Sequence, residues 1–143
     1  MKIIIGSDHA GFDMKEECRS HLEGSSSHQI TDIGVYNRDS SDYPRIAQIV
    51  ARSVAAREYD RGILICGSGI GMSIAANRFK EIRAALCHNL YLARMSRLHN
   101  DANILVMGGR VIGVGLALEM VDTFLNTPFE GGRHQKRLDM IDC

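Results

Sequence analysis

Short apolar segments alternate with amphipathic stretches along the chain. The apolar segments have the length and composition of β-strands. They lie at residues 2–6, 28–33, 62–66, 83–87 and 103–108. Helical periodicity is found over residues 13–23, 44–58, 71–79, 90–98 and 113–126. In the last of these, Leu116, Met120 and Phe124 recur at four-residue steps, so one face of the helix is apolar and is expected to pack on a sheet.

This alternation predicts the fold class. Strands that are apolar on both faces and alternate with helices are typical of a parallel sheet with helices on each side. We therefore expect an α/β fold, a doubly wound, Rossmann-like three-layer sandwich with a five-stranded parallel sheet. A chain of 143 residues has the length of one domain, so residues 1–143 are predicted to form a single one.

Composition excludes several classes of function. Seventeen basic side chains balance seventeen acidic ones, so no overall field attracts nucleic acid or an anionic membrane, and any anion site must be local. No segment has the length of a membrane span or of a signal-peptide core, which predicts a cytoplasmic protein. The four cysteines form no CxxC motif and the six histidines show no HExxH spacing. We expect no disulfide, no metal and no cofactor.

The segment LICGSGIGMS, residues 64–73, carries a cysteine into a glycine-rich stretch. A dinucleotide fingerprint would need glycine or alanine where Met72 stands, and a P-loop would end in Gly-Lys-Ser/Thr instead of Gly71-Met72-Ser73. The remaining interpretation is a turn whose backbone amides meet at a helix N-terminus and favour an anion. That anion is either a phosphate or an oxyanion that develops during a reaction.

Candidate side chains follow the predicted strands, where ligands bind in sheets of this kind. Cys66 directly precedes the amide-rich turn, which favours its thiolate and suits a base or nucleophile. The alternative is a small buried residue at a strand end. Asp8 and His9 follow the first strand, although SDHAG also suits a helix cap. His99, at a helix end, has the alternative role of a dipole contact.

The tail segment GGRHQKR, residues 131–137, is basic. Such a run is usually a solvated face. Arg133 and Arg137 are nevertheless four residues apart, so in a helix they would share one face and could bind a phosphate.

Six segments together resemble the ribose-5-phosphate isomerase B family, which also includes galactose-6-phosphate isomerase subunits and members that act on allose 6-phosphate. They occur in the family's order and span nearly the whole chain. The segments are SDHAGF (7–12), DYP (42–44), ICGSGIGMSIAANR (65–78), RLHNDAN (97–103), GGRVIG (108–113) and EGGRHQKR (130–137).

The resemblance implies a metal-independent aldose–ketose isomerase that interconverts ribose 5-phosphate and ribulose 5-phosphate. Such a reaction needs a base at C2 and fixed donors for an enediolate. Cys66 would be the base, Ser68 would transfer or bind the proton between O1 and O2, His99 would assist ring opening and Asp8 would orient the sugar. The implied substrate-binding residues are Gly67, Gly69, Ile70 and Gly71 through their amides, Tyr43 and Asn100 in the pocket, and His9, Arg110, Arg133, His134 and Arg137 at the phosphate.

The resemblance also implies how the subunits combine and which base is used. The active site would lie between two chains of a homodimer or tetramer, with the tail, residues 128–143, reaching the partner. Part of the family replaces the cysteine by a glutamate on the following helix, where this chain has Ala75 and Ala76, so the cysteine group is favoured. An isomerase of a hexose 6-phosphate, such as allose or galactose 6-phosphate, and a non-catalytic sugar-phosphate sensor remain alternatives. A receiver-type signalling domain would need an acidic pocket, for which the first strand end offers only Asp8.

Overall fold

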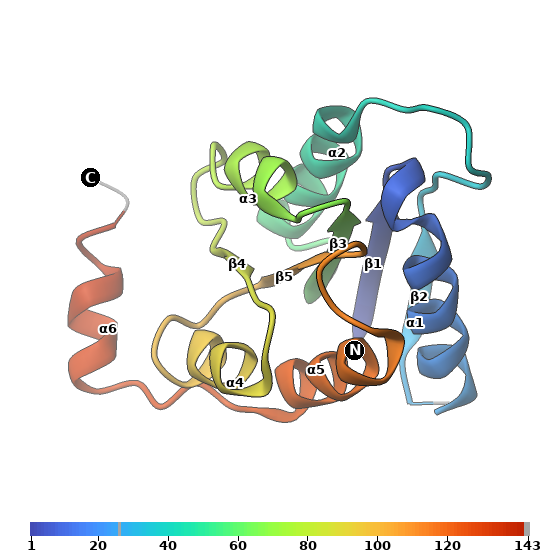
Figure 1. The fold of residues 1–143 in the computed structure, drawn as a ribbon. Coiled ribbons are helices and arrows are strands. Elements are labelled where there is room, and N and C mark those ends of the chain that lie inside the picture. The colour runs from blue at the N-terminus through green and yellow to red at the C-terminus, as the bar shows by residue number, and fades with distance from the viewer. Residues whose placement is uncertain (26, 142–143) are drawn as a thin grey trace.

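A parallel β-sheet forms the middle layer of the molecule (Figure 1). The structure, a computed structural model, describes residues 1–25 and 27–141. Within these residues the sheet has five strands in the order β2-β1-β3-β5-β4, all parallel. The strands are β1 (Lys2–Ser7), β2 (Gln29–Asp32), β3 (Arg61–Cys66), β4 (Ala84–Leu86) and β5 (Ile104–Gly108).

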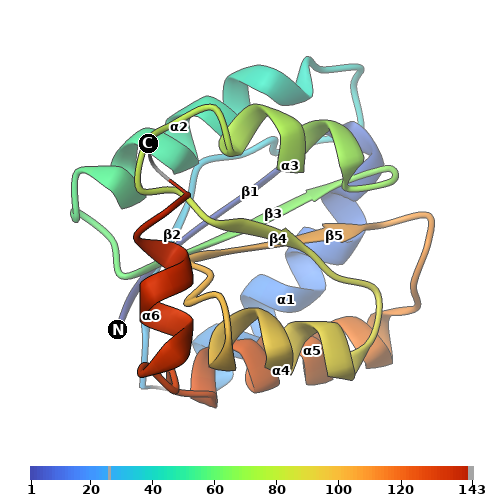
Figure 2. The same ribbon diagram turned by 90° about the vertical axis from the view of Figure 1, so that its left-hand side faces the viewer.

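Helices cover both faces of this sheet. On one face lie α2 (Tyr43–Ala55) and α3 (Ile70–Ala76), and on the other lie α1 (Phe12–Gly24), α4 (Leu90–Leu98) and α5 (Val114–Asn126) (Figures 1 and 2). Alternate residues of β1 serve the two cores: Ile3 and Ile5 pack towards α1 and α5, and Ile4 packs towards α2. The predicted three-layer α/β fold is therefore confirmed, and the central strands β1, β3 and β5 bury apolar side chains on both faces.

Two of the predicted helices end earlier in the structure than the sequence indicated. The helix expected over 44–58 ends at Ala55, since Arg57 has a φ of 58° that a continuing helix does not allow. The helix expected over 71–79 ends at Ala76, where the Asn77 side chain donates to the Ala84 carbonyl (2.9 Å) and accepts from the Ala84 amide (2.8 Å). The first helix is thus ended by backbone geometry and the second by side-chain hydrogen bonds, each before the apolar pattern ends.

A further helix, α6 (Arg133–Leu138), stands apart from the three layers, beyond the β4 edge of the sheet (Figures 1 and 2). The chain leading to it is fastened to the end of α4 by Arg97, whose side chain is buried. The Arg97 guanidinium donates to the carbonyls of Ala102 (2.5 Å) and Thr127 (3.3 Å) and pairs with Asp101 (2.8 Å). No helix in the described part of the chain is long and apolar enough to cross a membrane.

The turn after β1 is pressed against the end of β3. Residues His9–Gly11 form a short 3-10 helix, and Gly11 is buried where its α-carbon meets the backbone of Ile65. A Cβ at Gly11 would overlap the Ile65 carbonyl, so only glycine fits. This contact brings Asp8 and His9 next to Cys66, one residue beyond Ile65 in the chain.

We predict that Gly11→Ala lowers the free energy of unfolding by about 1–3 kcal/mol, because the methyl group forces the turn away from β3. Chemical denaturation followed by circular dichroism measures this. Gly24→Ala is the control, since a Cβ there meets no atom within 4 Å. Equal stability of the two variants would contradict the close packing of Gly11.

Candidate active site

A cleft of about 610 Å³ opens at the carboxyl ends of β1 and β3, beside the N-termini of α2 and α3. It contains most of the predicted site residues. The lining residues are Asp8, His9, Ala10, Tyr43, Cys66, Gly67, Ser68, Ile70, Gly71, Ile74 and Arg110. The cleft lies at the carboxyl edge of the sheet, where all the parallel strands end and where the sequence predicted it.

The loop between β3 and α3 bends back onto the Cys66 thiol. The Gly69 amide donates to Cys66 Sγ (3.1 Å), and Gly69 adopts a φ of 79° that favours glycine. The backbone of the loop thus directs one N–H donor at the sulfur. Cys66 is 5% exposed and lines the cleft.

The two other cysteines among the described residues lie in a different environment. Burial raises the pKa of Cys18 to about 12 and that of Cys87 to about 11. Both belong to the core between the sheet and the helices α1, α4 and α5. These two thiols therefore stay protonated near neutral pH, and Cys66 alone of the three lines the cleft.

The glycine-rich loop offers fewer free amides than its sequence predicts. The Gly69 amide is used by Cys66, and the Ile70 amide donates to the Ser68 hydroxyl (3.3 Å). Within the described residues the amides of Gly67, Ser68 and Gly71 donate to no protein acceptor. They are the donors available to an anion in the cleft.

Asp8 and His9 are held by the turn they belong to. Asp8 Oδ1 accepts from the amides of Ala10 (2.9 Å) and Gly11 (3.0 Å), which is the cap that the SDHAG sequence suggests. The His9 amide donates to Ser41 Oγ (3.1 Å), and His9 Nδ1 accepts from the Ser41 amide (3.2 Å). Since Nδ1 accepts, neutral His9 carries its proton on Nε2, which leaves that N–H as a donor.

Arg110 joins the cleft from the loop after β5. The Gly109 amide donates to the Cys66 carbonyl (2.8 Å), and the Arg110 amide donates to the Gly67 carbonyl (3.0 Å). These two bonds fasten the loop after β5 to the loop after β3. Arg110 carries the one guanidinium among the described residues that line the cleft, and these bonds place its backbone beside Gly67.

Tyr43 covers the N-terminus of α3. A Cβ on Gly71 would lie 2.6 Å from two ring atoms of Tyr43, so the absence of a side chain at Gly71 allows the ring to approach. Tyr43 is 39% exposed and begins α2, with Pro44 following it. The ring therefore forms one wall of the cleft and leaves its edge open to solvent.

Sequence reasoning missed three residues that shape the site. Ile74 lines the cleft one helical turn after Ile70, and both side chains are more than half exposed. Their sequence signal is a pair of apolar residues four positions apart on the side of the helix that faces away from the sheet. Ser41 positions His9, and no local pattern marks it. Glu130 contacts two predicted histidines, and its signal is its spacing of four residues from His134.

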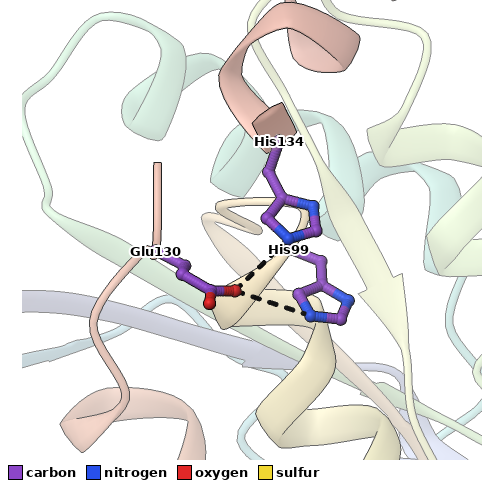
Figure 3. Close-up of side chains that lie close together, drawn as sticks. All are labelled: His99, Glu130 and His134. Carbon is purple, nitrogen blue, oxygen red and sulfur yellow. Dashed lines mark ion pairs between the residues drawn. The ribbon is translucent and has the colours of Figure 1, made fainter. Parts of the chain in front are cut away.

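The remaining predicted residues gather elsewhere in the chain. His99 follows α4, and its ring stacks on that of His134 from α6, with centroids 4.2 Å apart and an interplanar angle of 11°. Glu130 Oε2 lies 3.7 Å from His99 Nε2 and 3.3 Å from His134 Nε2 (Figure 3). Asn100, Arg133 and Arg137 are exposed around this group.

His134 is nearly buried within this group, with 5% of its surface exposed. Burial, followed by the charges of His99 and Arg133, lowers the pKa of His134, although Glu130 acts in the opposite direction. The imidazole is therefore neutral near pH 7. Arg133 and Arg137 lie one turn apart in α6, as the sequence spacing indicated, and they carry the positive charge of this group.

Within one chain, the residues that line the cleft do not meet the group around His99 and His134. Cys66 ends β3, whereas His99 precedes the start of β5, which pairs with β3 in parallel. They thus lie at opposite edges of the sheet, separated by about the 20 Å length of a six-residue strand. His99, Asn100, Arg133, His134 and Arg137 do not line the cleft of their own chain.

The parallel sheet, covered by helices on both faces and with a cleft at its carboxyl edge, places the chain in the Rossmann-like class of α/β proteins. Within this class, the chain belongs to the Ribose/Galactose Isomerase family, which it matches over residues 3–141.

Individual proteins named ribose-5-phosphate isomerase are similar to this chain over almost its whole length. The ribose-5-phosphate isomerase B of Escherichia coli (strain K12) is 48% identical over 140 residues, which cover 98% of this chain and 93% of that protein. The structure of ribose-5-phosphate isomerase B from Clostridium thermocellum superposes with a TM-score of 0.97 at 51% identity, covering 99% of this chain and 95% of the other. The Thermotoga maritima enzyme gives 0.96 at 53% identity, with coverage of 99% and 97%.

We predict that Asp8→Ala lowers the free energy of unfolding by about 1 kcal/mol, because the amides of Ala10 and Gly11 lose their acceptor. Asp8→Asn keeps an acceptor oxygen and should retain most of that stability. Thermal and urea unfolding of both variants would test the capping role. If the two substitutions cost the same, the carboxylate's charge matters and the cap does not.

Proposed function

We propose that this protein is a ribose-5-phosphate isomerase, acting in the cytoplasm on ribose 5-phosphate and ribulose 5-phosphate through an enediolate. The proposal depends mainly on one observation: Cys66, whose sulfur accepts a hydrogen bond from the Gly69 amide, lines the same cleft as Gly67 and Gly71. Membership of the Ribose/Galactose Isomerase family supports it. So does the similarity to relatives named ribose-5-phosphate isomerase B.

The chemistry divides between the thiolate and the amides. Cys66 takes the proton from C2 of the open-chain aldose, the electron pair moves into an enediolate whose charge lies on O1 and O2, and the Cys66 thiol returns the proton to C1 to give the ketose. The Gly67 and Gly71 amides donate to that charge, as an oxyanion hole does. Ser68, whose hydroxyl lines the cleft, bonds O1 or O2 while the proton moves between them. Asp8, one residue past β1, orients the sugar hydroxyls.

The phosphate group needs cationic or N–H donors away from the thiol. His9 offers Nε2–H, and Arg110 offers a guanidinium held by its backbone bond to Gly67. Tyr43 forms the wall between these donors and the start of α3. This arrangement supports a substrate with a phosphate at one end and a reacting carbonyl at the other.

The proposal includes a homodimer as the smallest active unit, with tetramers built from it. Two features support it. The group of His99, Asn100, Arg133 and Arg137 lies away from the cleft of its own chain, and α6 stands off the body, where it can reach a neighbour (Figure 1). In such a dimer, each cleft receives His99 for ring opening, Asn100 as a wall, and the arginines and His134 for the phosphate from the partner.

The direct experiment measures ketose formation from ribose 5-phosphate by the purified protein in the presence of a chelator. Allose 6-phosphate and galactose 6-phosphate are assayed alongside. We expect the fastest turnover on the pentose phosphate. Turnover on a hexose phosphate alone would keep the mechanism and change the substrate, whereas binding of all three without turnover would favour a sensor.

We predict that Cys66→Ala lowers kcat by at least about 100-fold, because the base at C2 is lost. Binding of ribose 5-phosphate, measured by calorimetry, should remain, since the amides and Arg110 are untouched. Cys87→Ala is the matched control, because that thiol is buried in the opposite core. Turnover by Cys66→Ala close to that of the control would exclude the thiol as the base.

We predict that two inactive variants restore activity when mixed. In a heterodimer of Cys66→Ala and His99→Asn chains, one cleft combines an intact Cys66 with an intact His99. Random exchange makes half of the dimers mixed, so about a quarter of the wild-type activity should return. Each variant mixed with itself is the control. No recovery after verified subunit exchange would place the two residues in sites within one chain.

A further inference from the structure

We propose that His99, Glu130 and His134 form a binding site for a divalent transition-metal ion, with Zn²⁺ as the ion that fits best. One nitrogen from each histidine and one carboxylate oxygen lie within 4.8 Å of one another (Figure 3). They come from the end of α4, from the segment before α6, and from α6 itself. The spacing of these three residues in the sequence does not match a metal-binding motif such as HExxH.

The distances are close to those of a coordinated set. Zinc binds imidazole nitrogen at about 2.0–2.1 Å and carboxylate oxygen at about 2.0–2.2 Å, so two donors on one tetrahedral zinc lie about 3.3–3.5 Å apart. Glu130 Oε2 is 3.3 Å from His134 Nε2 and 3.7 Å from His99 Nε2. Because the two imidazoles are stacked nearly in parallel, the His99 ring has to rotate before the three donors can coordinate one ion.

Backbone bonds hold the three residues in place. The Glu130 amide donates to the Leu98 carbonyl (3.0 Å), directly before His99. The His134 amide donates to the Gly131 carbonyl (3.0 Å), and the His99 amide closes the end of α4 on Met95 (2.9 Å). The donors are therefore supported by the main chain on both sides of the group.

His134 provides a second and independent observation. Its side chain is buried, yet within the described residues its Nε2 has no hydrogen-bond partner of acceptable geometry. That nitrogen points to the Glu130 carboxylate (Figure 3). Buried polar atoms are rarely left unsatisfied, and such exceptions are commonly ligand or ion sites. A metal ion between Nε2 and Oε2 would satisfy both.

The other two ligands can adjust. His99 is 39% exposed and Glu130 is 57% exposed in their side chains, so the His99 ring can turn out of its stack to direct a lone pair at the ion. The same exposure gives the fourth position to water, as in three-ligand zinc sites.

The donor set also predicts selectivity. Two imidazoles and one carboxylate suit Zn²⁺, Co²⁺, Ni²⁺ and Cu²⁺, whereas Mg²⁺ and Ca²⁺ prefer oxygen ligands. Arg133 and Arg137 on α6 oppose a cation nearby. We therefore expect reversible binding that responds to metal concentration, in contrast to a permanently occupied structural site.

Occupancy has a consequence that rests on the proposed function. Metal-bound His99 cannot exchange a proton with the sugar ring, so zinc should slow turnover of the furanose form. The ion would then be an inhibitor supplied from outside, while the isomerisation itself proceeds in chelator. Binding and inhibition are measured separately, so failure of one is distinguishable from failure of the other.

The test titrates the full-length, chelator-stripped protein with Zn²⁺ by calorimetry and with Co²⁺ by visible absorption. Glu130→Gln should weaken Zn²⁺ binding at least tenfold and abolish the tetrahedral Co²⁺ spectrum, and circular dichroism checks its fold. Asp139→Asn, which removes another exposed carboxylate close to α6, is the matched control and should bind as the wild type does. Mg²⁺ serves as the ion that should not compete.

Three results would overturn the site. They are unchanged Zn²⁺ affinity in Glu130→Gln, equal loss in Asp139→Asn, and a Co²⁺ spectrum with sulfur-to-metal charge transfer, which would assign the ion to cysteine. His134→Asn gives a second check if the first variant is ambiguous, and it should also lose binding. Zinc binding that leaves turnover unchanged would retain the site and contradict the role proposed for His99.

Discussion

Two backbone hydrogen bonds between neighbouring loops hold the cleft together: Gly109 to the Cys66 carbonyl and Arg110 to the Gly67 carbonyl. Each joins the end of β3 to the end of β5, which are adjacent and parallel in the sheet. Because the main chain makes these bonds, the backbone positions of Cys66, Gly67 and Arg110 relative to one another do not depend on side-chain rotamers. The turn after β1 packs against the end of β3 through Gly11, which contacts Ile65.

The chemistry expected of the cleft uses this rigidity. In the proposed reaction, Cys66 is the base, and the Gly69 amide donates to its sulfur (3.1 Å). Other amides of the same loop are left for the charge that develops on the substrate. Under this proposal, one loop would serve the sulfur before proton transfer and the enediolate after it.

Much of this could be predicted from the sequence. The strands were found because a doubly covered parallel sheet needs apolar residues on both faces, and the cleft followed because parallel strands end at one edge. Cys66, Asp8, His9 and Arg110 meet there for that reason.

Other features depend on contacts that no local pattern encodes. The division of the predicted residues between two edges depends on where α6 is placed, which Arg97 and the Glu130 amide decide through carbonyls distant in sequence. The pairing of Glu130 with His99 has the same origin. Helix ends at Ala55 and Ala76 were missed because backbone geometry at Arg57 and a side-chain bond from Asn77 override the apolar period. The loss of the Gly69 amide to Cys66 required the geometry of the loop.

The isolation of α6 has a thermodynamic consequence. Six residues are too few to form a stable helix on their own. Its order therefore depends on a few attachments, chiefly the buried His134 ring and the Glu130 amide. A ligand that binds only the ordered form of α6 would use part of its binding free energy to order this helix. Its measured affinity would therefore depend on the local unfolding equilibrium of α6. The end of the sheet that carries the thiol is held by the protein core, whereas the helix that carries Arg133 and Arg137 depends on these few attachments.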